Sequence, residues 1–331
     1  MNYQRRVIWL AAVLGVLLLT YIVGVLAIPH PGASAREPLV PGFRTEEIEA
    51  ITIEGPSGQI DLERQGDSWS VILDGDRYPA RDDRINVLLD SIASAQIVRS
   101  VTNRSEAYDD LGLGESGVDV TFSTGDVATH LRVGGSSTNY GGSYVVLEDR
   151  EEVYAIDKEL GFYFGQPYSY FAYLRMFPED LYGSGIVALS VDVNLVEQPD
   201  VTRSYSYSLT FQESDGSETW LLNYDGGEVA ADVSAVDSLL RATADLVGSG
   251  FYRDVDPLTL PVVGTVSFTV SDGREYRYEV RQGDGLFAMQ GSGSGLQYVE
   301  GSRSPIWYEV TLPTLRRLFP EPDSLLPEET E

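Results

Sequence analysis

The residue types that most often carry catalysis are scarce in this chain of 331 residues, which has no cysteine and two histidines. The missing cysteines exclude disulfides, thiolate metal sites and a cysteine nucleophile. His30 lies near the N-terminus, and His130 lies on a predicted strand, pointing away from the face that holds Leu131 and Val133. One histidine per folded region is too few for a histidine metal site, and no Ser-x-x-Lys motif precedes the single lysine, Lys158. We therefore expect no catalytic, cofactor-binding or metal-binding residues.

Glycine and aspartate clusters have a structural interpretation. The glycines of 134–143 lead into a predicted strand, whereas a phosphate-binding loop leads into a helix N-terminus, so this stretch predicts a hairpin connection. Asp-Gly pairs at 74–75, 225–226 and 284–285 lack the spaced oxygen ligands of a calcium loop and predict turns. The net charge of −28 disfavours nucleic acid as a partner. Among 51 acidic residues, a carboxylate pair that hydrolyses glycan remains an alternative.

Aromatic residues concentrate in one stretch, residues 161–177, which joins two similar halves of the chain. Such a cluster predicts either a wedge buried between the halves or an exposed patch that binds a protein, a glycan or a lipid headgroup, because tyrosine suits a surface that is partly dry. The candidate partner-binding residues are Phe162, Tyr163, Phe164, Tyr168, Tyr170, Phe171, Tyr173 and Phe177.

The elements that would position this stretch occur twice. At an offset of 151 residues, Trp69 falls on Trp220, and the Asp-Gly turn after each tryptophan also matches. Ile85, Leu88, Leu89 and Ile92 have helical spacing, with Asp82 or Asp83 as the N-cap, and a matching helix follows Trp220. Alternating apolar residues predict strands on both sides of each helix. The expected core residues of the two halves are Trp69, Leu88, Leu89, Trp220, Leu239 and Leu240.

The N-terminus carries an uncharged run over residues 7–28, preceded by Arg5 and Arg6. At 1.5 Å per residue it spans about 33 Å, enough to cross a bilayer core of about 30 Å. The arginines predict a cytoplasmic N-terminus, with the rest of the chain outside the inner membrane. The alternative is a cleavable signal peptide, since residues 33–35 read Ala-Ser-Ala.

Six motifs are typical of one family: Trp69 before Asp-Gly, the Ile85–Leu89 helix, Tyr108-x-x-Leu-Gly-Leu, Leu131-Arg-Val-Gly, Tyr144-Val-Val and Val153-Tyr-Ala-Ile. In these motifs the chain resembles the domain-of-unknown-function family 4340, best over residues 48–160 and less well over 186–319. The second half lacks the Gly-Leu element and carries Pro257 and Pro261 instead, and the proline that the family has near Ser116 is absent. The resemblance implies a bacterial membrane-anchored envelope protein, often encoded beside an ABC transporter of the gliding-motility type, and supplies no catalytic residues.

The expected fold class is α+β, with an N-terminal transmembrane helix followed by two tandem copies of a strands–helix–strands domain. We expect a non-enzymatic, single-pass interaction or scaffold protein of the cell envelope. Its partners would be the lipid bilayer through residues 7–28, an envelope protein and candidate ABC transporter subunits, with no cofactor. The alternatives are the glycan hydrolase above and a glycan- or solute-binding module. The expected parts are a cytoplasmic tail (1–6), the transmembrane helix (7–28), a tether (29–44), a first repeat (45–160), an aromatic linker (161–183), a second repeat (184–320) and a disordered acidic tail (321–331).

Overall fold

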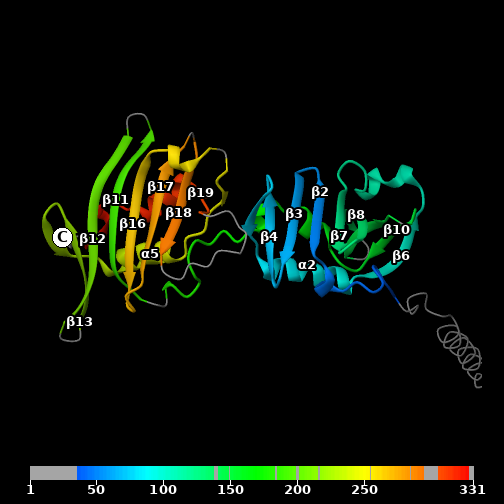
Figure 1. The fold of residues 1–331 in the computed structure, drawn as a ribbon, viewed down its shortest axis with the longest axis horizontal. Helices are drawn as coiled ribbons and strands as arrows, with labels where there is room; N and C mark the ends of the chain where they lie inside the picture. Colours follow the sequence, from blue (N-terminus) through cyan, green and yellow to red (C-terminus); the bar gives the residue numbers. More distant parts are fainter. Residues whose placement is uncertain are drawn as a thin grey trace, which may run out of the picture.

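The computed structural model describes residues 36–137, 141–148, 150–182, 185–198, 201–214, 217–253, 255–283, 285–293 and 305–327. Their strands form two sheets, of ten and nine strands, which lie one after the other along the longest axis of the molecule (Figure 1). Each sheet is built from antiparallel pairs, so each can keep one face in water while the other is buried.

The first sheet contains the strands before the aromatic stretch. Its order is β1 (Glu37–Pro38), β6 (Gln96–Thr102), β10 (Val153–Ile156), β9 (Gly142–Leu147), β8 (Val127–Ser137), β7 (Val118–Thr124), β2 (Ala50–Gly55), β3 (Gly58–Gln65), β4 (Ser68–Leu73) and β5 (Asp76–Pro79).

The second sheet contains the strands after it. Its order is β14 (Gly227–Ala230), β13 (Ser217–Tyr224), β12 (Val201–Ser214), β11 (Ile186–Gln198), β16 (Val262–Val270), β17 (Glu275–Gln282), β18 (Phe287–Gly293), β19 (Tyr308–Val310) and β15 (Gly250–Phe251). Apart from the additional edge strand β1, the strands of the first sheet follow the same order when they are read from β5.

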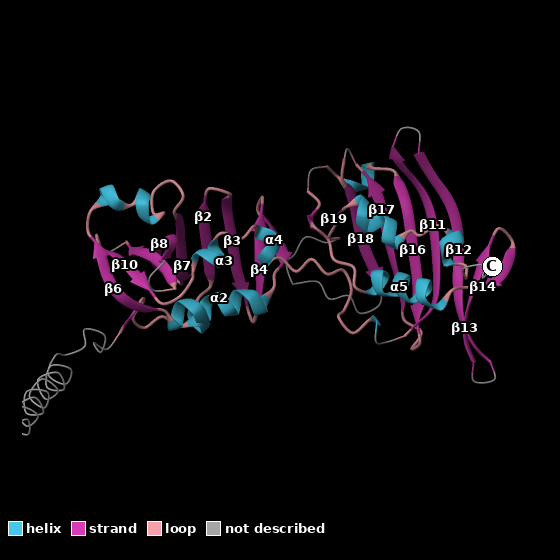
Figure 2. Cartoon of the chain, turned by 180° about the vertical axis from the view of Figure 1, so that it is seen from behind, coloured by secondary structure: helices cyan, strands magenta, loops and turns pink. Residues whose placement is uncertain are grey.

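One helix of about three turns packs on each sheet. These are α2 (Asp82–Ser94) and α5 (Val233–Ala244), which cross the lower part of their sheets in Figure 2. The remaining helical segments are α3 (Gly161–Phe164), α4 (Tyr168–Phe171) and α6 (Leu312–Leu318), with short 3₁₀ turns η1 (Thr45–Glu47), η2 (Ser105–Ala107), η3 (Asp109–Leu111), η5 (Pro257–Thr259) and η6 (Pro322–Leu325).

The core of each half lies between the helix and the sheet. Ile85, Leu88, Leu89 and Ile92 of α2 are at most 1% exposed, and Trp69 of β4 is 1% exposed. The other expected core residues, Trp220, Leu239 and Leu240, are also buried. Apolar residues of successive strands lie side by side under α2, as in the pairing of Leu62 with Val71. Each fully buried residue of this size stabilises the fold by about 1.5–3 kcal/mol relative to exposure.

The start of α2 differs from the expected N-cap. Its N-cap residue is Arg81, whose side chain makes no capping hydrogen bond. Asp82 instead accepts a hydrogen bond of 2.8 Å from the backbone N–H of Trp69, so its carboxylate joins the helix to β4. In α5 the side chain of Asp232 does cap the helix, accepting from the N–H of Ala235 at 2.8 Å.

The predicted fold class is wrong. The described residues consist mainly of antiparallel strands in two sheets of unequal size, not of the α+β fold expected from the sequence. Strands extend over more of the chain than the sequence pattern predicts, and β11 and β12 reach 13 and 14 residues. No helix in the described part of the chain is long and apolar enough to cross a membrane, and the span expected over 7–28 lies outside that part.

Two segments expected to be extended or disordered pack on the sheets. Leu39, placed in the tether by sequence, is fully buried, and its N–H donates to the carbonyl of Ala95 at 2.8 Å. Leu325, placed in the acidic tail, is 1% exposed, and its carbonyl accepts from the N–H of Asp232 at 2.8 Å. The expected tail 1–6, the first part of the tether and residues 328–331 lie outside the described residues.

Candidate functional site

The aromatic connector, residues 161–177, leaves the first sheet after β10 and reaches the second through α3 and α4. Three of its eight candidate residues are buried: Phe164 is 4% exposed, Phe171 0% and Phe177 2%. Phe162 is 53% exposed. The other four are partly buried, namely Tyr163, Tyr168, Tyr170 and Tyr173. Seven of the eight side chains are therefore at least partly buried.

On one side, the connector pairs with the end of β5. The N–H of Arg81 donates to the carbonyl of Phe171 at 2.6 Å, and the N–H of Tyr173 donates to that of Pro79 at 2.8 Å. Between these bonds, Ala80 and Ala172 form a β-bridge. The connector thus covers the edge of the first sheet, where strand hydrogen bonds would otherwise remain open.

On the other side, the connector pairs with the segment that follows α5. The N–H of Gly248 donates to the carbonyl of Leu174 at 2.9 Å, and the Arg175 guanidinium lies 2.6 Å from a carboxylate oxygen of Asp245. Phe177 enters the core of the second sheet, with its ring centroid 5.4 Å from that of Phe268. The connector is therefore hydrogen-bonded to both halves.

The two halves also touch each other directly. The rings of Tyr78 and Phe251 stack with centroids 4.4 Å apart, and Arg253 forms an ion pair with Asp74. The hydroxyl of Tyr168 accepts the N–H of Phe251 at 3.2 Å. Burial raises the pKa of the Tyr168 phenol, which keeps it neutral. We call these contacts, together with the hydrogen bonds of the connector to both halves, the joint.

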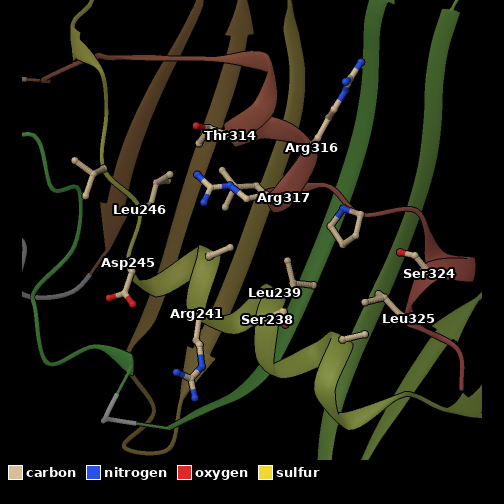
Figure 3. A pocket seen from close by; sticks show the side chains of 15 residues that line it. Ser238, Leu239, Arg241, Asp245, Leu246, Thr314, Arg316, Arg317, Ser324 and Leu325 are labelled. Carbon is tan, nitrogen blue, oxygen red and sulfur yellow. The ribbon is translucent and has the colours of Figure 1, made fainter.

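A groove opens on the second sheet between α5 and the segment formed by α6 and η6 (Figure 3). Its volume is about 600 Å³, within the range usual for binding pockets. The side of α5 that lines it carries small residues at helical spacing, Ala235, Ser238 and Ala242. Apolar side chains form much of the remaining wall, including those of Leu239, Leu246, Leu318 and Leu325.

Three arginines lie at the groove, although the chain as a whole carries a net charge of −28. Arg316 forms an ion pair with Glu197, and Arg241 forms one with Asp237; the nitrogen-to-oxygen distances are 2.8 and 2.9 Å. Arg317 has no hydrogen bond or ion pair with any described residue. Figure 3 shows its side chain extending from α6 across the groove toward Leu246, whereas Arg316 and Arg241 point away from the centre. The groove therefore offers apolar walls and, among the described residues, one arginine without an ion-pair partner.

The other residues considered from the sequence lie away from this groove. His130 is on the open face of the first sheet, where its Nδ1 is 2.7 Å from the Thr121 hydroxyl and its Nε2 is 3.6 Å from Glu148. The glycines 134–135 lie in β8 and Gly142 in β9, so this stretch belongs to a hairpin. No group of three or more histidine, aspartate or glutamate side chains in the described residues could hold a metal ion.

In the described part of the chain, each carboxyl group with a shifted pKa has a lowered pKa. Hydrogen bonds from Arg316 lower the pKa of Glu197, and a hydrogen bond from Tyr182 lowers that of Asp237. Asp83, Glu152, Asp232 and Asp272 are lowered as well. A general acid needs the opposite shift, so none of these six suits that role.

Sequence reasoning did not find the groove. Ala235, Ala242 and Ser324 are small residues that carry no chemistry, and a basic residue near a C-terminus is an ordinary surface feature. Comparing matched positions of the two halves could have indicated the groove. Ala235 occupies the position that Arg84 has in the first half, 151 residues earlier. Ser324 likewise stands where the first half has Tyr170, 154 residues earlier.

Comparison with known families adds one match. The family described as Domain of unknown function (DUF4340) matches residues 69–261. The chain belongs to this family. The matched range begins at Trp69 in β4 and ends at Pro261 just before β16, so the family's pattern includes the connector and both sides of the joint. No curated protein and no solved structure matches the chain.

Proposed function

We propose that the protein is a non-enzymatic interaction scaffold of the cell envelope. The observation that carries this proposal is the joint, because a connector hydrogen-bonded to both sheets fixes their relative position. A fixed pair of sheets, each with one open face, can present separate surfaces to partner proteins at a constant spacing.

The proposed location is the outer side of the inner membrane. It rests on the sequence of residues 1–28, where two arginines precede an uncharged run, with the bilayer as the partner of that run. The resemblance to envelope proteins encoded beside ABC transporters makes a transporter subunit the first partner to test.

The experiment is photo-crosslinking in living cells. A photoreactive amino acid is placed at the exposed positions Val127 and Val262, one on each sheet (68% and 41% exposed). We expect crosslinks to envelope proteins, with transporter subunits among them. Crosslinks to no envelope protein from either position would contradict the scaffold proposal.

A further inference from the structure

On the first sheet, side chains of the protein itself fill the place that corresponds to the α5–α6 groove; we call this place the first groove. Arg84 of α2 donates to the carbonyl of Tyr170 at 2.6 Å, and its guanidinium carbon lies 4.3 Å from the centroid of that ring. Phe162 packs edge-on against Tyr163 and Tyr170, with centroids 5.2 and 6.1 Å away. The Ser91 hydroxyl lies 3.4 Å from the Tyr163 hydroxyl. Aromatic rings and one arginine therefore occupy this groove.

Backbone hydrogen bonds show that the two grooves are comparable. The N–H of Arg81, just before α2, donates to the carbonyl of Phe171 at 2.6 Å. The N–H of Asp232, just before α5, donates to the carbonyl of Leu325 at 2.8 Å. Phe171 ends α4 and Leu325 ends η6, so both segments meet their helix at the same point.

Side-chain size then explains why only one groove is open. The positions of Arg84 and Ser91 in α2 are taken by Ala235 and Ala242 in α5, and that of Tyr170 is taken by Ser324. The positions of Phe162 and Tyr163 are taken by Arg316 and Arg317. The second groove thus lacks every ring that fills the first, and it has gained positive charge.

We infer that the α5–α6 groove binds a segment of a partner protein that inserts an aromatic side chain flanked by carboxylates. The ring would lie against Ala235, Ala242 and Leu325, where the first groove holds its own rings. The carboxylates would pair with Arg317, which has no partner in the described part of the chain. Aromatic anchors and arginines are the residues that dominate binding energy at protein interfaces. This inference names the partner chemistry of the proposed scaffold and rests on that proposal.

The test uses the full chain in mild detergent and fluorescent peptides. The probe is a short peptide with one phenylalanine between two aspartates; its controls carry alanine in place of phenylalanine, or lysines in place of the aspartates. Binding is measured by fluorescence anisotropy. We expect the probe to bind and both controls to bind at least about tenfold more weakly.

Two variants of the protein locate the binding. The double substitution Ala235→Arg with Ser324→Tyr rebuilds the pair that fills the first groove, and Arg317→Glu reverses the free charge. We expect each to weaken probe binding at least about tenfold. Arg277→Glu makes the same charge change on the open face of the second sheet and should leave the affinity within about twofold. Thermal unfolding checks that every variant folds.

Several results would overturn the inference. These are no measurable binding of the probe, equal binding of the alanine peptide, or unchanged affinity in the filled variant. Self-association of the wild-type chain that the filled variant abolishes would assign the groove to a second copy instead. Crosslinks to envelope proteins that the filled variant does not alter would leave the scaffold proposal standing while rejecting this groove as the binding site.

Discussion

Tyr78 and Phe251 stack face to face, with ring centroids 4.4 Å apart and an angle of 25° between the ring planes. Tyr78 lies in β5, the last strand of the first sheet, and Phe251 lies in β15, the last strand of the second. The two sheets therefore meet edge to edge through aromatic rings, and the connector closes the joint with backbone hydrogen bonds. Of the eight rings that sequence suggests for a partner, three are buried and four are partly buried.

Replacing Phe251 tests how much this joint stabilises the protein. Phe251 is fully buried, and Phe251→Ala should lower the free energy of unfolding by about 3–5 kcal/mol because it removes a packed ring and leaves a cavity. Urea unfolding followed by tryptophan fluorescence measures the change. Phe162→Ala is the control, since this ring is 53% exposed and should cost less than about 1.5 kcal/mol. Equal losses in the two variants would contradict the packing described.

Replacing Arg84 tests the filled groove of the first sheet. Arg84→Ala removes a charged hydrogen bond to the Tyr170 carbonyl and a cation–π contact, so we expect a loss of about 1.5–3 kcal/mol in the free energy of unfolding. Arg104→Ala is the matched control, because Arg104 is exposed and its loss should change stability by about 0.5 kcal/mol or less. Losses of the same size in both variants would contradict the role assigned to Arg84.

Two neighbouring glycines test the structural role of the glycine-rich stretch. A Cβ at Gly134 would lie 2.6 Å from the carbonyl oxygen of Leu111 and 2.8 Å from Cγ of Leu113. Gly134→Ala should therefore destabilise the protein by about 1–3 kcal/mol. At Gly135 the nearest atom would be 3.5 Å away, and alanine should be tolerated. Thermal unfolding distinguishes the two, and similar midpoints would show that close packing does not require Gly134.

The ion pairs of Glu197 predict that the stability of the protein depends on pH. The Glu197 side chain is 4% exposed and lies between Arg316 and Arg203, and hydrogen bonds from Arg316, with the charge of Arg203, hold its pKa below the ordinary 4.5. A lowered pKa adds stability that is fully present above the pKa of the unfolded chain and is lost as the pH falls through the folded pKa.

The matched variant for this prediction is Glu197→Gln. The stability difference between wild type and Glu197→Gln should be largest near neutral pH and should shrink below about pH 4. Urea unfolding of both proteins at a series of pH values measures it. A difference that stays constant between pH 7 and pH 3 would show that the pKa of Glu197 is not lowered by folding.

Local structure could be predicted from the sequence wherever neighbouring residues determine the backbone conformation. Asp74 and Asp225 are the non-glycine residues with positive φ in the described part of the chain, at 54° and 51°, and each begins an Asp-Gly turn that the sequence indicates. The apolar spacing from Ile85 to Ile92 likewise gives a helix, with its predicted side buried. These features depend on neighbours within a few residues.

Features that depend on distant contacts could not be predicted. The extent of the sheets depends on which strands pair, as when β1 joins β6 some sixty residues later. Sequence predicts Asp82 or Asp83 as the N-cap of the helix, but the Asp82 carboxylate accepts a hydrogen bond from the N–H of Trp69 in β4. The α5–α6 groove is lined by Ala235 and Ser324, two small residues that lie far apart in sequence. Such features become visible only when the partners are placed together.

The rigid joint is the claim on which the scaffold proposal depends, and a distance measurement tests it directly. The chain has no cysteine, so Val127→Cys and Val229→Cys, on β8 and β14, place one exposed spin label on each sheet. Pulsed electron paramagnetic resonance of the doubly labelled chain should give one narrow distance distribution, which Phe251→Ala broadens. A broad or multiple distribution in the otherwise wild-type chain would contradict a fixed joint.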